Sequence, residues 1–360
     1  MSQWAFGVER QLPARTTLAA FYIGSRTQNV LRSRNVNAPV CAPELQLVTN
    51  GCVGAPRPDP TAGNIFEYES TGTLDQNRLN VNIRSAFRQG FNLFANYSLG
   101  FAKGDSDGAG SFPGYSYALE DEFGRSSFDV RHNFVVGGNF SMPWGISVSP
   151  FIIASSGRPF NITRGVDANG DTLFTERPTF SQLADACTRW GVTASYCDIS
   201  DQDPNAIIPR NYGQGPGFFT VNLRLGKNFG FGSSDQTVAT QGGGQQRGPG
   251  GGGLAGAAGG GRRGGGGGGG GRGGGRGMGG GGMFGGPEVR KPYNLNVGIA
   301  FNNLFNTVNF GSPVGNIQSG RFGLSTSTGG GFGGFGPGGG GGGGGGSANR
   351  RIELQARFSW

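Results

Sequence analysis

The chain has 360 residues, 76 of them glycine, and a formal net charge of +8. Length alone would suggest roughly two or three soluble domains. However, much of the glycine lies in two tracts, within 242–286 and 329–346, and the remainder favours β-strands and turns. No run of about 18 apolar residues is present, which excludes a membrane-spanning helix. Part of the charge comes from arginines in the first glycine tract, so it does not indicate nucleic-acid binding by the whole chain.

The first predicted elements are two strands with one apolar face each. In 1–10, and again in about 15–25, apolar residues recur at every second position. Alternate side chains of a strand point to opposite faces, so this spacing predicts strands joined by a short turn at 11–14. A polar, proline-rich stretch of about 26–76 follows, in which 65–70 also has strand character.

The clearest predicted hairpin covers about 79–101. Apolar residues alternate on both sides of Gln89-Gly90, which is a strong hairpin signal. A soluble β-sandwich would give the same alternation. The arms, however, are about a dozen residues long, whereas the strands of soluble proteins usually have about five or six.

Five more strands are expected after this hairpin. They cover about 128–140, 146–154, 219–226, 294–301 and 350–360. Their connections are a loop at about 104–126, a short turn at 142–145, a long loop at 161–216, the first glycine tract, and a last loop at 304–349. This gives nine strands of membrane-spanning length.

The last strand carries a signature of its own. Every second residue from Ile352 to Trp360 is apolar, and the residues between them are mostly polar or charged. A tilted strand of roughly 9–11 residues crosses a bilayer once. Bacterial outer-membrane barrels typically end in such a strand, with a terminal aromatic residue. Phe358 and Trp360 are therefore the predicted barrel signature.

The connections alternate between short and long, which is typical of outer-membrane barrels with short periplasmic turns and longer outer loops. The predicted fold is all-β, a transmembrane antiparallel up-and-down β-barrel, here a partial barrel of about nine long strands. Single-chain bacterial barrels have an even number of strands, and 1–10 lacks the features of a signal peptide. Both observations predict that earlier strands are missing. A cytosolic protein is the alternative.

The four cysteines form two local pairs in predicted loops. Cys41 lies near Cys52, and Cys187 lies near Cys197. This spacing predicts two loop-stapling disulfides in an oxidising compartment; four free thiols are the alternative. The spacings do not fit a zinc site, and His132, the single histidine, lies in another segment.

One segment of the long loop resembles a calcium-binding loop. Asp167, Asn169 and Asp171 offer oxygen ligands at alternate positions, and Glu176 follows. The segment departs from an EF-hand because the twelfth position is Pro178. A polar turn without a metal is the alternative, and no other cofactor is expected.

No catalytic motif is found, so the protein is not expected to be an enzyme. His132 is expected to be structural, near the rim of the membrane. Four arginines of the first glycine tract have the spacing of an RGG segment, which can bind single-stranded nucleic acid: Arg262, Arg263, Arg272 and Arg276. The tract contains a single aromatic residue, Phe284, so a flexible insertion is favoured and no nucleic-acid partner is expected.

Five phrases, in this order, resemble signatures of the Oar-like TonB-dependent receptors. They lie at 128–135, 142–145, 155–160, 221–229 and 301–310. The resemblance implies the carboxy-terminal part of a 22-stranded barrel that takes up bulky nutrients, and it covers about 64–360. On this interpretation 1–360 is one barrel portion, with glycine-rich disordered insertions at about 241–286 and 329–346, and it lacks the plug and the signal peptide.

The implied partners are outer-membrane lipid, the missing barrel strands and plug, the TonB complex through the missing part, and the barrel-assembly machinery through the last strand. The implied location is the cell outer membrane of a Gram-negative-type bacterium. Two other functions stay open on the sequence: a structural or adhesion barrel that displays disulfide-stapled loops, and an RGG-type nucleic-acid binder.

Overall fold

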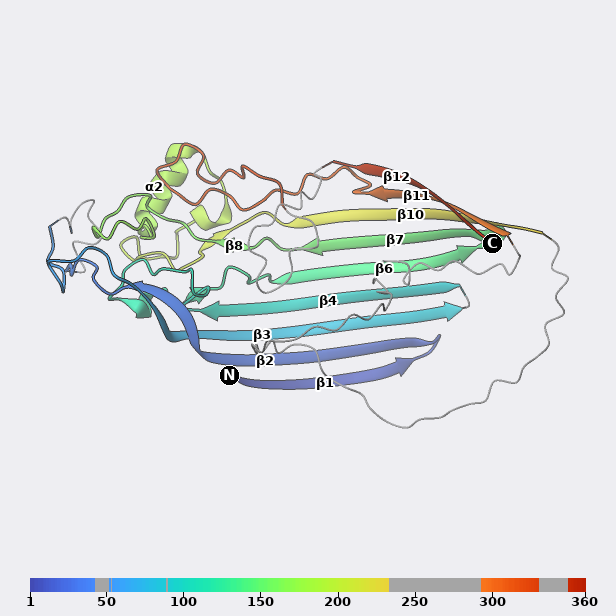
Figure 1. Ribbon diagram of the computed structural model, residues 1–360, viewed down its shortest axis with the longest axis horizontal. Helices are drawn as coiled ribbons and strands as arrows, with labels where there is room; N and C mark the ends of the chain where they lie inside the picture. Colours follow the sequence, from blue (N-terminus) through green and yellow to red (C-terminus); the bar gives the residue numbers. More distant parts are fainter. Residues whose placement is uncertain (43–51, 53, 89, 233–292, 330–348) are drawn as a thin grey trace, which may run out of the picture.

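A single antiparallel sheet dominates the computed structural model (Figure 1). The structure describes residues 1–42, 52, 54–88, 90–232, 293–329 and 349–360. Within these residues the long strands are ordered β1-β2-β3-β4-β6-β7-β10-β11-β12, and the short β5 pairs with β4. Each long strand pairs with the next long strand along the chain. The nine predicted strands and their up-and-down order are confirmed.

The long strands are β1 (Ser2–Leu12), β2 (Thr16–Asn35), β3 (Phe66–Arg88), β4 (Phe91–Gly104), β6 (His132–Met142), β7 (Ile146–Ser155), β10 (Phe218–Phe231), β11 (Tyr293–Asn302) and β12 (Arg351–Ser359). The short strands are β5 (Gly124–Arg125), β8 (Pro159–Phe160) and β9 (Gly213–Gln214). The helices are α2 (Phe180–Trp190) and the 3-10 turns η1 (Leu119–Glu122), η2 (Pro143–Gly145) and η3 (Ser195–Cys197). No helix in the described ranges is long and apolar enough to cross a membrane.

The register of the sheet brings apolar positions of neighbouring strands side by side. One such row crosses seven strands through Val8, Ala20, Val81, Tyr97, Phe134, Ala154 and Phe219. A second row crosses the other half through Phe91, Phe140, Val148, Leu225, Ile299 and Leu354. Since a slip of one residue would turn each apolar set to the opposite face, this pattern fixes the register.

The opposite face is rich in polar side chains. A row of four partners on this face consists of Asn80, Ser98, Asn133 and Ser155. Hydrogen bonds connect some of these side chains across strands: the Asn96 amide donates to Asn82 Oδ1 at 2.5 Å, and Arg224 Nη2 donates to Gln355 Oε1 at 3.0 Å. The sheet therefore has one apolar face and one mainly polar face.

Three predicted boundaries are wrong. The predicted loop 26–76 is shorter, because β2 continues to Asn35 and because β3 begins at Phe66 and runs on without a break from the expected strand segment 65–70. The predicted strand 128–140 begins only at His132, because the preceding turn is held by Asp129. The buried carboxylate of Asp129 accepts a hydrogen bond from the Ala102 backbone N–H and pairs with Arg125 at 2.7 Å.

Of the connections that the structure describes, the long ones gather at one end of the sheet, and the short turns lie at the other (Figure 1). The predicted loop 161–216 is wrong as a loop, because it contains α2, η3 and β9. We refer to these gathered connections as the loop layer, which consists of 105–131, 156–217 and the described parts of 36–65 and 303–350.

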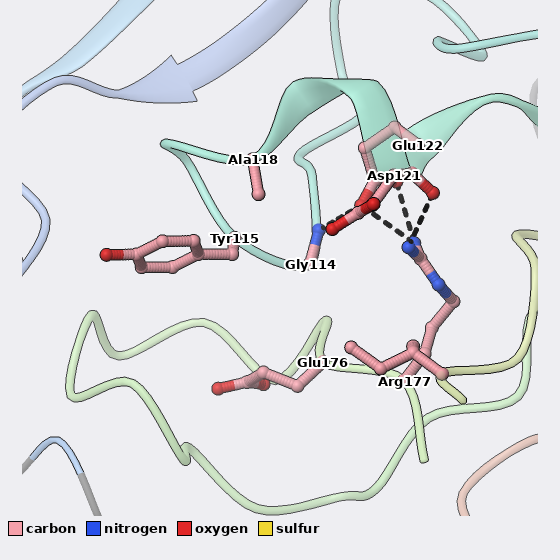
Figure 2. A pocket seen from close by; sticks show the side chains of 8 residues that line it. Gly114, Tyr115, Ala118, Asp121, Glu122, Glu176 and Arg177 are labelled. Carbon is pink, nitrogen blue, oxygen red and sulfur yellow. Dashed lines mark hydrogen bonds and ion pairs between the residues drawn. The ribbon is translucent and has the colours of Figure 1, made fainter. Parts of the chain in front are cut away.

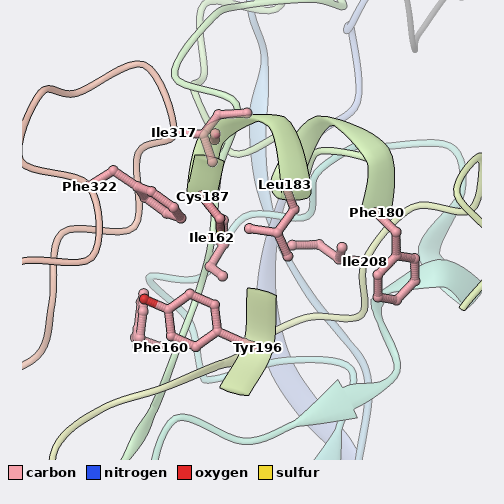
Figure 3. Packing of buried hydrophobic residues seen from close by; sticks show 10 residues of the cluster. Phe160, Ile162, Phe180, Leu183, Cys187, Tyr196, Ile208, Ile317 and Phe322 are labelled. Atoms are coloured by element: carbon pink, nitrogen blue, oxygen red, sulfur yellow. The ribbon is translucent and has the colours of Figure 1, made fainter. Parts of the chain in front are cut away.

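The loop layer has a hydrophobic core of its own. Figure 3 shows the side chains of its buried members, which come from β8 and the residues just after it, α2, η3, the segment between η3 and β9, and the segment after β11. They are Phe160, Ile162, Phe180, Leu183, Ala186, Cys187, Tyr196, Ile208, Ile317 and Phe322. The Cys187–Cys197 disulfide ties α2 to η3 beside this core. The connections therefore fold together, in the way a small soluble domain does.

Helix α2 was not predicted, although its sequence carries helix signals. Thr179 and Gln182 form a reciprocal capping box at its start, and Gly191 adopts a left-handed conformation at its end. Between them, Phe180, Leu183 and Cys187 are buried at helical spacing. A capping box followed by apolar residues at this spacing would have predicted the helix.

Candidate functional site

The predicted calcium-binding segment is a tight loop built around one carboxylate. Asp167 Oδ1 accepts hydrogen bonds from the backbone N–H groups of Gly170 and Asp171, at 2.7 and 3.1 Å. Asp167 Oδ2 accepts a third from Thr172 N–H at 2.8 Å. The turn requires positive φ at Gly170, and these bonds hold the backbone in that conformation.

Glu176 folds back over the same loop. Its Oε1 accepts hydrogen bonds from the backbone N–H groups of Ala168 and Asn169, at 2.7 and 3.3 Å. Asp171 Oδ1 accepts from Leu173 N–H at 2.8 Å. As a result, one carboxylate oxygen each from Asp167, Asp171 and Glu176 lies within 4.8 Å of the other two.

Two carboxylate oxygens in this cluster have no hydrogen-bond partner. Asp171 and Glu176 are only 1% and 8% exposed, and their Oδ2 and Oε2 atoms are buried without a donor. Burial raises the pKa of Asp171 to about 6 and that of Glu176 to about 7, and repulsion from neighbouring carboxylates adds to the rise in both pKa values. Buried anionic oxygens without a hydrogen-bond donor are costly, and no donor among the described residues reaches these two.

Asn169, the third predicted ligand, has other contacts. Its Oδ1 accepts a hydrogen bond from Asp171 N–H at 3.0 Å, and its Nδ2 donates to the Gly114 carbonyl at 3.3 Å. The structure thus brings Asp167 and Asp171 together with Glu176, while the Asn169 side chain links this loop to another connection.

Three connections meet at the acidic loop. From the β2–β3 connection, Arg57 donates to the Gly170 carbonyl at 3.0 Å and Asn64 donates to the Asp171 carbonyl at 2.6 Å. From the β4–β6 connection, the Pro113 carbonyl accepts from Thr175 Oγ1 at 2.7 Å. These contacts bridge 62 to 113 residues of sequence. The acidic loop is therefore a junction of the loop layer.

A small pocket borders the junction, with a volume of about 40 Å³. Figure 2 shows Glu176 on one side of it, with its carboxylate directed away from the Arg177 guanidinium. Arg177 Nη1 binds both oxygens of Glu122, at 2.7 and 2.8 Å, and both side chains are almost fully buried. This neighbouring ion pair is already satisfied, so Arg177 does not neutralise Glu176.

The structure also places the other predicted residues. Disulfides join Cys41 to Cys52 and Cys187 to Cys197, both in the loop layer. His132 lies at the start of β6, with its Nδ1 2.8 Å from the Tyr97 hydroxyl.

At the opposite end of the sheet, the Phe358 ring lies 6.2 Å from that of Tyr293 and 5.9 Å from that of Trp360. Trp360 is 89% exposed. The RGG arginines and both glycine tracts fall outside the described residues, apart from Gly329 at the start of the second tract.

A family model described as "Outer membrane beta barrel domain" matches residues 1–241. The chain belongs to this family. The outer membrane beta barrel domain covers the strands from β1 to β10 and accounts for their up-and-down pairing and for the apolar face of the sheet, and it places the protein in the outer membrane. The predicted location is confirmed.

Solved structures similar to this barrel domain include three outer-membrane proteins. The outer membrane transporter YddB from Escherichia coli is 10% identical, with 85% of this chain and 28% of that chain covered and a TM-score of 0.40. The ferric-catecholate import receptor Fiu from E. coli K12 is 10% identical, with 89% and 25% covered and a TM-score of 0.38. The siderophore receptor PiuA from Acinetobacter baumannii is 9% identical, with 86% and 24% covered and a TM-score of 0.37. The barrel domain spans about a quarter of the length of these chains. No curated protein sequence matches it.

Proposed function

We propose that this barrel domain is the carboxy-terminal section of a larger TonB-dependent receptor barrel, which takes up bulky nutrients. The observation that carries the proposal is the open sheet. In the described residues β1 and β12 each pair on one side only, so each leaves a row of backbone groups unpaired. Such groups cannot remain unpaired in the hydrocarbon of a bilayer, so further strands must complete the wall.

The two faces of the sheet define the surroundings of this wall. The apolar rows fit lipid, and the polar face, with Asn82, Asn96 and Arg224, fits a water-filled lumen. The end with short turns fits the periplasm, and the loop layer with its two disulfides fits the cell exterior. A plug and the TonB complex belong to the remainder of such a receptor.

The transport proposal is tested by the uptake of nutrients from a limiting medium. Bacteria that lack the gene and bacteria that lack TonB should both leave the same compounds in the spent medium, as measured by mass spectrometry. Reintroducing the gene should restore uptake only where TonB is present. If the gene deletion leaves the medium unchanged but reduces attachment of the cells to surfaces, the barrel displays its disulfide-stapled loops and does not transport.

A pair of neighbouring substitutions tests which face meets lipid. In the whole receptor, Val81→Arg places a charge on the apolar face, which costs about 2–4 kcal/mol at the bilayer midplane. Asn82→Arg places the same charge on the opposite face and should be tolerated. Quantitative immunoblots of outer-membrane fractions should therefore show a much lower level for Val81→Arg. Equal levels of the two variants would contradict the assignment of faces.

A further inference from the structure

We propose that Asp167, Asp171 and Glu176 bind a calcium ion that holds three outer connections of the sheet together. The proposal does not depend on transport, because it concerns only the described loop layer. It extends the sequence expectation by replacing the Asn169 side chain with that of Glu176 as a ligand.

The spacing of the three carboxylates fits one shared cation. Calcium lies about 2.3–2.6 Å from its oxygen ligands, so two ligands on opposite sides of the ion are roughly 5 Å apart. The three carboxylate oxygens lie within 4.8 Å of one another. Three anionic groups at this separation repel one another unless a cation lies between them.

The unpartnered oxygens give an independent reason to infer a ligand. Asp171 Oδ2 and Glu176 Oε2 are buried, and no donor in the described part of the chain reaches them. The opposite oxygen of each carboxylate accepts backbone N–H groups, which fix the orientation of the free oxygen. A site with fixed, unpaired carboxylate oxygens is preorganised for a metal ion.

The nearby arginines do not take this role. Arg57 donates to backbone and amide oxygens around the loop: the carbonyls of Asn37 and Gly170 and the side chain of Asn64. Arg177 is engaged by Glu122. Both arginines are thus held by other acceptors. The buried Arg164 interacts electrostatically with Glu176, but no hydrogen bond from the described residues reaches Glu176 Oε2 or Asp171 Oδ2, so these two oxygens stay available to a cation.

Calcium fits this site better than magnesium. Calcium takes six to eight oxygen ligands in irregular geometry, including carboxylates, backbone carbonyls and water. The site offers three carboxylates from an irregular loop, and the pocket that Glu176 borders has room for water. Magnesium requires near-ideal octahedral geometry and releases water reluctantly.

The bound ion would act on the junction described above. Asp171 is held by Asn64 of the β2–β3 connection, and Thr175, next to Glu176, is held by Pro113 of the β4–β6 connection. Fixing Asp171 and Glu176 around one ion therefore orders all three connections. Removal of the ion should loosen the loop layer and leave the transmembrane sheet intact.

The test uses the whole receptor, extracted in detergent, treated with a chelator and transferred to metal-free buffer. Equilibrium dialysis with radioactive calcium should show one site that Asp171→Asn and Glu176→Gln each weaken by at least about tenfold. Calcium should also slow proteolysis within 161–216, and magnesium at the same concentration should slow it much less. Asp201→Asn removes an exposed carboxylate of the same layer and should leave both results unchanged.

A folding defect is distinguishable from loss of the site. Without calcium, Asp171→Asn removes a repelling buried charge, so this variant should resist proteolysis at least as well as the unaltered protein. With calcium, it should be the less resistant of the two. The proposal is overturned if calcium does not bind, if it protects the unaltered protein and both variants equally, or if magnesium protects as well as calcium.

Discussion

Arg177→Met is expected to open the loop layer. The guanidinium of Arg177 binds both oxygens of Glu122, and its other nitrogens donate to the carbonyls of Asp121 and Ile208 at 3.0 Å. Both charged side chains are less than 5% exposed. Removing one partner leaves a buried charge without compensation, which typically costs about 3–5 kcal/mol. Protease cleavage within 105–131 and 156–217 should accelerate on the order of 100-fold in the membrane-embedded protein.

The matched control is Arg189→Met, which removes an exposed arginine from α2 in the same layer and should change cleavage little. Glu122→Gln tests the pairing from the other side. The double variant Arg177→Met with Glu122→Gln should be less destabilised than the sum of the two single variants, because neither charge then lacks its partner. If the double variant is destabilised by the sum of the two single effects, Arg177 and Glu122 do not stabilise the layer as a pair.

Leu183→Ala is expected to loosen helix α2 without disturbing the sheet. Leu183 is fully buried in the loop-layer core (Figure 3), where the surrounding side chains come from four separate segments. Deleting a buried leucine typically costs about 2–5 kcal/mol, through lost burial and the cavity that remains. Hydrogen exchange followed by mass spectrometry should show faster exchange of α2 amides and unchanged exchange of β6 and β7.

Thr188→Ala provides the comparison, because Thr188 lies on the same helix and is exposed. It should leave exchange of the α2 amides nearly unchanged. Equal exchange of α2 in Leu183→Ala and in the unaltered protein would mean that the core does not hold the helix. Faster exchange throughout the sheet would mean that the loop layer and the strands open as one unit.

The strands could be predicted because their signal is local. The parity of Leu79, Val81 and Ile83 assigns those side chains to one face of a strand whatever the strand pairs with. The ends of the strands were less predictable. Strand β6, which contains Phe134, begins only at His132. The turn before it is held by the buried Asp129, whose carboxylate accepts a hydrogen bond from the Ala102 backbone N–H. That contact joins β4 to the turn before β6, and no periodicity within one strand records it.

The candidate site was only partly predictable. Alternating oxygen ligands marked Asp167 and Asp171, but the short spacing also suggested Asn169, whose side chain contacts the Gly114 carbonyl. Glu176 completes the cluster because the backbone doubles back and two N–H groups orient its carboxylate. The burial that leaves its other oxygen without a donor depends on loops far away in the sequence.

The strands of the wall and their two faces follow from the amino-acid sequence alone, because an alternation of period two does not depend on what each strand pairs with. The sequence also places the cysteines close enough along the chain to pair. That the outer connections form one layer with a core is visible only in the folded protein, since Glu122 meets Arg177 across 55 residues and Arg57 meets Gly170 across 113. Such contacts depend on which strand ends lie side by side, and the assembled sheet sets that arrangement.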